Sequence, residues 1–339
     1  MRNESDHILP DEKRVANRAI FGIILVSARD ECRSGDTGVM LKTEIASQRY
    51  KGLDTWDDDE ILRALWDGQM NAVAALRPAM PALAAAAGAL ADRLNRPTSR
   101  LVYAGAGASG LLAIQDGMEM TPTFGWPSDR LIFLMAGGDK ARLSPDGASE
   151  DDADSAEWDV GNHGLGPDDA VIAVAASGTT RYTCHVVAAA KKAGTLTVAI
   201  ANNADTELLN QADCPVLLDT GPEVIAGSTR LGAGTAQKAA LGILSTLVMV
   251  WLGHVMDGLM VSMVATNAKL QDRAARMLQS ITGAGDAEAR EALQAAQGRV
   301  KTAALIVRGL DAGEADRRLA AAGGNLRRAL AGLDPDGST

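Results

Sequence analysis

Five short apolar runs, each leading into a segment of helical character, constrain the fold of this chain more than any other feature. The runs lie at 101–104, 131–135, 170–175, 195–200 and 214–218. Apolar strands that alternate with helices form a parallel sheet whose two faces are covered by helices. The sequence therefore predicts an α/β protein, a three-layer α/β/α sandwich built on a parallel, flavodoxin-like sheet.

The segments outside these runs predict further helices. Residues 57–95 carry apolar side chains at helical spacing, with a break expected near Pro78 and Pro81. A long apolar helix is expected at about 234–255, packed against the sheet. The alanine- and arginine-rich remainder predicts a small terminal bundle. We therefore divide the chain into an extension at 1–40, a main domain with N-terminal helices at 41–270, and a C-terminal helical domain at 271–335.

The extension at 1–40 differs in character from the rest of the chain, because it is charged, irregular and ends at a second methionine, Met40. We expect it to be poorly ordered. One hypothesis is that translation starts at Met40, and peptides from residues 2–39 in the native protein would refute it.

Composition and charge exclude several functional classes. The formal net charge of −10 argues against a nucleic-acid binder, because basic side chains supply most of the affinity for phosphate backbones. The apolar stretches at 19–28 and 239–253 are short for a membrane span. The three cysteines share no CxxC spacing, and the histidines form no HxH or HExxH pattern, so no metal and no cofactor is implied. We expect a cytoplasmic protein.

The loop after the first strand, Gly105-Ala106-Gly107-Ala108-Ser109-Gly110, is a literal GxGxxG. This pattern alone would indicate a dinucleotide site. However, such a site needs an acidic residue at the end of the second strand, and here that strand ends in Ala136-Gly137-Gly138. The hydroxyl of Ser109 inside the turn favours a phosphate group instead.

A second loop of the same kind comes after the third strand, where Ser177-Gly178-Thr179-Thr180 opens a helix. Two hydroxyl-bearing loops at strand ends, each opening a helix, can hold one phosphate with backbone N–H groups and helix dipoles. The plainer alternative is that these hydroxyls only cap their helices. Two such loops in one sheet favour the phosphate cradle.

At this point the sequence resembles a known family, the N-acetylmuramic acid 6-phosphate etherases of the sugar isomerase (SIS) fold. The likeness extends from about Thr43 to the C-terminus through several short motifs in the same order. The longest runs from Pro222 to Lys238 and includes Gly227-Ser228-Thr229-Arg230-Leu231. The others lie at 43–44, 105–110, 116–125, 136–138, 149–152, 175–178, 267–270 and 323–327.

The resemblance implies cleavage of the D-lactyl ether at C3 of the sugar, by elimination and then addition of water. That chemistry needs a base for the C2 proton and an acid for the departing ether oxygen. Glu119 and Glu150 fall at the two acid/base positions of the family, and their roles are left open between acid and base. We expect Glu119 near the end of the helix that Ser109 opens, just before a Thr-Pro turn.

The resemblance and the two loops together give the expected binding residues. Arg230 can pair with the substrate or brace Glu223, and the sequence leaves both open. The full set expected to bind the sugar phosphate is Gly107, Ala108, Ser109, Gly110, Ser177, Gly178, Thr179, Thr180, Glu223, Ser228, Thr229, Arg230 and Lys238.

Three positions depart from the family pattern. The family has cationic residues where this chain has Leu111, Thr179 and Gly232, and Arg181 is placed to compensate for one of them. A charge-assisted hydrogen bond contributes about 1.5–3 kcal/mol, so losing several changes the affinity or the ligand. Two alternatives stay open: a non-catalytic sugar-phosphate sensor like the glucokinase regulatory protein, and an aldose–ketose isomerase. We expect a homodimer paired through the apolar helix at 243–251.

Overall fold

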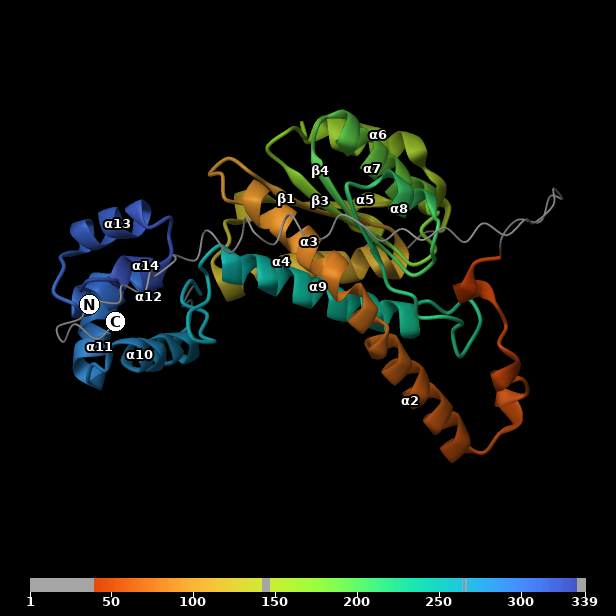
Figure 1. Ribbon diagram of the computed structural model, residues 1–339, viewed down its shortest axis with the longest axis horizontal. Coiled ribbons are helices and arrows are strands. Elements are labelled where there is room, and N and C mark those ends of the chain that lie inside the picture. Colours follow the sequence, from red (N-terminus) through yellow and green to blue (C-terminus); the bar gives the residue numbers. More distant parts are fainter. Residues whose placement is uncertain (1–39, 142–146, 264, 266, 334–339) are drawn as a thin grey trace, which may run out of the picture. The chain divides into compact units, whose positions relative to one another are not determined.

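The computed structural model describes residues 40–141, 147–263, 265 and 267–333. The extension expected at 1–40 and the apolar stretch at 19–28 lie outside these residues, apart from Met40. Within them, residues from Met40 onward form one compact unit. Its centre is a five-stranded parallel sheet, as the sequence predicts (Figure 1). The strands are β1 (Leu101–Gly105), β2 (Leu131–Met135), β3 (Ala170–Ala175), β4 (Leu196–Ala201) and β5 (Cys214–Leu217).

The strand order β2-β1-β3-β4-β5 places a topological switch point between β1 and β3. The two strands pair directly, from Leu101 opposite Ala170 to Gly105 opposite Val174. From β1 the chain moves outward to β2, and from β3 it moves the other way to β4. In open parallel sheets, the loops at such a point leave a crevice at the carboxyl ends of the strands.

Helices cover both faces of the sheet and form two apolar layers. On one face, α3 (Leu76–Leu94), α4 (Gly107–Phe124) and α9 (Gly232–Trp251) pack together with inward side chains such as Tyr103 and Ile172. On the other, α6 (Ala153–Asn162), α7 (Arg181–Lys192) and α8 (Glu207–Gln211) enclose the alternate side chains of the same strands. The three-layer sandwich is therefore confirmed.

The helix before the sheet breaks at a different place from the one expected. α2 (Asp58–Ala74) ends at Ala74, and α3 begins at Leu76 after the single residue Ala75. Pro78 lies in the first turn of α3, where backbone N–H groups have no partner within the helix and a proline costs little. Pro81 lies inside α3 without ending it. Short 3-10 turns precede α2 at Lys42–Glu44, Gln48–Tyr50 and Leu53–Thr55.

The C-terminal part is helical, with an apolar cluster of its own. This cluster joins side chains from Val261 and Met263 to Leu326 and Leu330. Its first helix begins at Ala268, slightly before the expected boundary at 270. The helices are α10 (Ala268–Thr282), α11 (Asp286–Ala295), α12 (Val300–Val307), α13 (Ala312–Ala321) and α14 (Leu326–Leu330). The remaining short elements, all near the sheet, are α5 (Gly138–Ala141), η4 (Ser128–Arg130) and η5 (Gly147–Asp151).

Two helical stretches of the described chain, α2 with α3 and α9, are long and apolar enough to cross a membrane by length and composition alone. Core helices of soluble proteins meet the same criterion. Here α9 packs against α2, α3 and α4, and much of it is buried by these neighbours.

Candidate active site

Two helix N-termini meet at the switch point, and neither is capped by a side chain. α4 comes after β1 with Ala106 at its N-cap position, and α7 comes after the β3 loop with Thr180 at that position. The first backbone N–H groups of such helices have no partner within the helix, and the helix dipole favours an anion there. The loop hydroxyls therefore do not act as side-chain caps of these two helices, which was the plainer alternative.

The glycines of the first loop have a packing role. A Cβ atom on Gly105 would stand 2.8 Å from Gly110 Cα and 2.9 Å from the Val174 carbonyl oxygen. Gly107 adopts a left-handed conformation with φ of 52°. The GxGxxG pattern thus lets β1, the turn and α4 pass close together, with Ser109 buried and Ala108 exposed.

The second loop is held in shape by its own hydroxyls. The backbone N–H of Thr179 donates to Ser177 Oγ over 3.1 Å, and the hydroxyls of Ser177 and Thr180 are 3.2 Å apart. Gly178 has φ of 72° and lies directly against the Thr206 side chain. Thr179 and Arg181 are exposed at the start of α7. The loop therefore presents a rigid, hydroxyl-lined edge beside the first loop.

Glu150 lies at the first loop. Its Oε1 is 2.7 Å from the position that a Cβ atom on Gly107 would occupy. Burial raises the pKa of the Glu150 carboxyl, and the charge of Asp151 raises it further. A carboxyl that holds its proton above the ordinary range is suited to exchange protons near neutral pH.

Glu119 lies toward the C-terminal end of α4, the helix that begins at the first loop. It is exposed, and at 1.5 Å per residue it is about 18 Å along the α4 axis from Gly107. The expected Thr-Pro turn does not come after it, because α4 continues through Pro122 to Phe124. One chain therefore does not bring Glu119 and Glu150 together.

A buried carboxylate supports the part of α4 that carries Glu119. Asp116 accepts hydrogen bonds from Tyr103 Oη at 2.9 Å and Ser245 Oγ at 3.3 Å. Burial raises the pKa of Asp116, the two hydrogen bonds and the charge of Lys238 lower it, and the charge of Glu119 raises it. Lys238 and Glu119 thus both act electrostatically on Asp116, and sequence reasoning did not single out this carboxylate.

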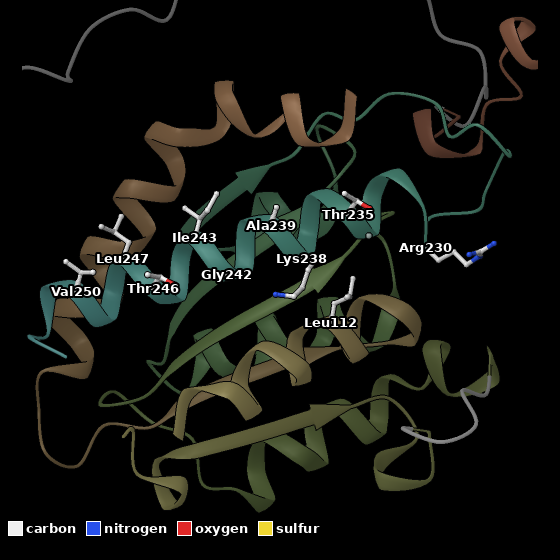
Figure 2. Close-up of a pocket in the computed structure, with 11 residues that line it drawn as sticks. Leu112, Arg230, Thr235, Lys238, Ala239, Gly242, Ile243, Thr246, Leu247 and Val250 are labelled. Atoms are coloured by element: carbon white, nitrogen blue, oxygen red, sulfur yellow. The ribbon is translucent and has the colours of Figure 1, made fainter. Parts of the chain in front are cut away.

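An open groove runs along α9 beside α4, with a volume of about 980 Å³. Leu112 of α4 and Lys238 of α9 face each other across it in Figure 2, and Arg230 lies beyond the start of α9. Glu119 is two turns after Leu112 on the same face of α4. The remaining lining is mostly apolar and comes from α9: Gly234, Thr235, Ala239, Gly242, Ile243, Thr246, Leu247 and Val250.

Glu223 has a structural task in which Arg230 takes no part. Its carboxylate is buried and accepts hydrogen bonds of 2.8 Å from the backbone N–H groups of Gly232 and Ala233. Glu223 therefore satisfies the first two backbone N–H groups of α9. Arg230 is exposed, and no hydrogen bond or ion pair joins it to Glu223 in the described part of the chain.

The turn that precedes α9 is held to an early segment of the chain. The backbone N–H of Gly227 donates to the Thr43 carbonyl oxygen at 2.9 Å, and the Asn203 amide donates to Thr43 Oγ1 at 3.1 Å. The Glu44 carboxylate lies beside Gly227. Ser228 and Thr229, in the same turn, are both partly buried. The early Thr-Glu motif was part of the resemblance, but its contact with this turn was not predicted.

Comparison with known proteins assigns the chain to a family. Residues 157–252 match the model of the SIS domain, and residues 84–191 match that of the glucokinase regulatory protein N-terminal SIS domain. An N-acetylmuramic acid 6-phosphate etherase of Deinococcus radiodurans is 50% identical over 85% of this chain and 95% of its own length. The chain belongs to the N-acetylmuramic acid 6-phosphate etherase family.

More distant members support the same assignment. The etherase of Rubrobacter xylanophilus is 41% identical over 86% of this chain and 96% of its own length. Among solved structures, a phosphoheptose isomerase from Francisella tularensis shares 15% identity, with a TM-score of 0.43 over 57% of this chain and 100% of its own, a match too distant to bear on function.

Two of the positions expected to depart from the etherase pattern have clear local contacts. Leu111 packs with Ile114, Met135 and Ala141 beside the first loop. A Cβ atom on Gly232 would stand 3.0 Å from Glu223 Oε2, so glycine permits the close approach of that carboxylate. Within the described residues, no group of three His, Cys, Asp or Glu side chains could hold a metal ion.

Replacing Glu223 with alanine is expected to destabilise the domain. The N–H groups of Gly232 and Ala233 would lose their partner in a buried place, which costs about 1–3 kcal/mol of the free energy of unfolding. Urea denaturation measures this loss. Asp311→Ala, which removes an exposed cap of α13, provides the comparison, with a smaller expected cost of about 1 kcal/mol. An unchanged midpoint for Glu223→Ala would contradict the assigned role.

Proposed function

We propose that this chain is an N-acetylmuramic acid 6-phosphate etherase, a carbon–oxygen lyase of the amino-sugar branch of cell-wall recycling. The observation that supports it most directly is a relative of that name at 50% identity across nearly its whole length. The geometry is compatible, because two uncapped helix N-termini meet at the switch point and a carboxyl with a raised pKa lies beside them.

In this proposal the loops at 105–110 and 176–180 hold the 6-phosphate through backbone N–H groups and hydroxyls. One glutamate removes the C2 proton, which the neighbouring aldehyde of the open-chain sugar acidifies. The other protonates the ether oxygen at C3, so that D-lactate leaves and a C2–C3 double bond forms. Water then adds at C3 and a proton returns to C2, giving N-acetylglucosamine 6-phosphate.

The two glutamates must come from different subunits. The C2 proton and the ether oxygen at C3 belong to adjacent carbons of one sugar. In one chain, however, Glu119 is about 18 Å along α4 from the first loop, where Glu150 lies. A second copy can cover the groove beside α9 by packing its own α9 antiparallel to that of the first copy. Glu119 of the second copy then lies toward the loop at 105–110 of the first copy. The exposed apolar side chains of α9, Ile243, Val250 and Trp251, suit such a contact. We therefore propose a cytoplasmic homodimer with two shared sites.

Incubation with N-acetylmuramic acid 6-phosphate is expected to release D-lactate and N-acetylglucosamine 6-phosphate. Glu119→Gln and Glu150→Gln are each expected to lower kcat/KM by about 10²–10⁴-fold, because each removes a proton-transfer group. A coupled D-lactate assay with mass spectrometry of the sugar measures both. Binding of the sugar phosphate without turnover would favour the sensor, and a ketose without lactate would favour the isomerase.

The shared site predicts complementation between inactive variants. A heterodimer of Glu119→Gln with Glu150→Gln contains one site with both substitutions and one with neither. When isolated with two affinity tags, it is expected to recover about half of the wild-type activity. Each variant alone, carried through the same exchange, is the control. If both glutamates served one site from a single chain, the heterodimer would stay inactive.

Asp151→Asn is expected to move one limb of the pH profile of kcat/KM to lower pH. The charge of Asp151 raises the pKa of Glu150, so its removal lowers that pKa toward the ordinary value. The acidic limb moves if Glu150 is the base, and the alkaline limb moves if it is the acid. Asp154→Asn, at an exposed position of the same acidic run, serves as the control and should leave both limbs in place.

A further inference from the structure

A row of large apolar side chains is exposed along one face of α2. Leu62, Trp66, Met70 and Val73 have exposed fractions of 65, 66, 49 and 48%. Their spacing of three and four residues places them on one face over successive turns. A continuous exposed row of this size marks an interaction site.

The same face of α2 begins with acidic side chains. Asp58 and Asp59 lie in the first turn, one turn before Leu62, and both are exposed. Asp59 is 2.6 Å from Arg63, and Asp58 forms no ion pair within the described part of the chain. A surface that covers this face must therefore be apolar along most of its length and basic at one end.

A groove beside α10 has this combination. Its volume is about 560 Å³, and Leu259, Leu270 and Met277 supply apolar walls. Lys269, Arg273 and Arg276 line it from one face of α10, at helical spacing. No ion pair within the described residues engages any of the three. In a chain with a net charge of −10, such a cluster favours an acidic partner.

The connections of the two elements to α9 place them at its opposite ends. Near the start of α9, the Thr235 hydroxyl donates a hydrogen bond to Gln69 of α2. Just beyond the end of α9, Gly253 lies against Asn325, and Arg327 pairs with Asp257, so the C-terminal helices attach there. If two copies of α9 pack antiparallel, the α2 helix of one copy comes next to the C-terminal helices of the other.

We propose that α2 of each subunit docks in the α10 groove of its partner, with Trp66 in the apolar part and Asp58 and Asp59 facing Arg273 and Arg276. The two contacts are equivalent by symmetry and flank the α9 pair. This inference rests on the dimer proposed above for its geometry, and it does not depend on which reaction the protein catalyses.

Dilution of the full chain in sedimentation velocity measures the dimer dissociation constant. Trp66→Asp is expected to raise it about 30-fold or more, because buried tryptophans carry much of the energy of an interface. Trp158→Asp is the matched control, because Trp158 on α6 has the same exposed fraction of 66%. At concentrations low enough for the wild type to be monomeric, both variants should keep its thermal midpoint. A dimer that Trp66→Asp leaves unchanged would overturn the proposal.

A charge exchange tests the orientation of the contact. Arg273→Asp with Arg276→Asp, and separately Asp58→Lys with Asp59→Lys, are each expected to raise the dissociation constant about 10-fold. All four substitutions in one chain are expected to restore it to within about threefold of wild type. Absence of restoration would refute the acid–base contact, and a monomer at every concentration would refute the docking altogether. A dimer that behaves as expected but releases no lactate would contradict only the proposed reaction.

Discussion

The parallel pairing of β1 with β3 joins two strands whose next helices cover opposite faces of the sheet. Because of it, the N-termini of α4 and α7 open at the same edge, side by side and without side-chain caps. The glycines at 105 and 110 allow the close passage of backbone that this pairing requires. Without that pairing the two helix N-termini, which we propose bind the phosphate, would not lie next to each other.

The length of α4 imposes the second constraint. A helix of this length is rigid enough to hold Glu119 and the first loop apart, and Asp116, bonded to Tyr103 and Ser245, anchors it to the sheet and to α9. The lone chain is therefore catalytically incomplete under the proposed mechanism. The exposed apolar faces on α2 and α9 are the surfaces through which we propose that a second copy completes it.

The sequence predicted the strands well, because buried parallel strands are continuous apolar runs whose ends are marked by glycine and polar residues. It predicted the end of α4 poorly, since Pro122 was taken as a stop although a proline can be accommodated when the surrounding packing holds the helix. The role of Glu223 was not decidable from sequence, because its partners are backbone N–H groups and leave no residue-type signal. Likewise, the separation of Glu119 from Glu150 depends on the tertiary packing of η5, which places Glu150 beside Gly107.

The contact of Thr43 with Asn203 and Gly227 has a consequence for the order of assembly. It joins one of the first described residues to a turn more than half the chain away, so it forms only after β4 and that turn have been synthesised. Closing such a long loop is entropically unfavourable until the sheet that holds its far end exists. On the ribosome, Thr43 therefore cannot make these contacts until the residues up to Gly227 have been synthesised.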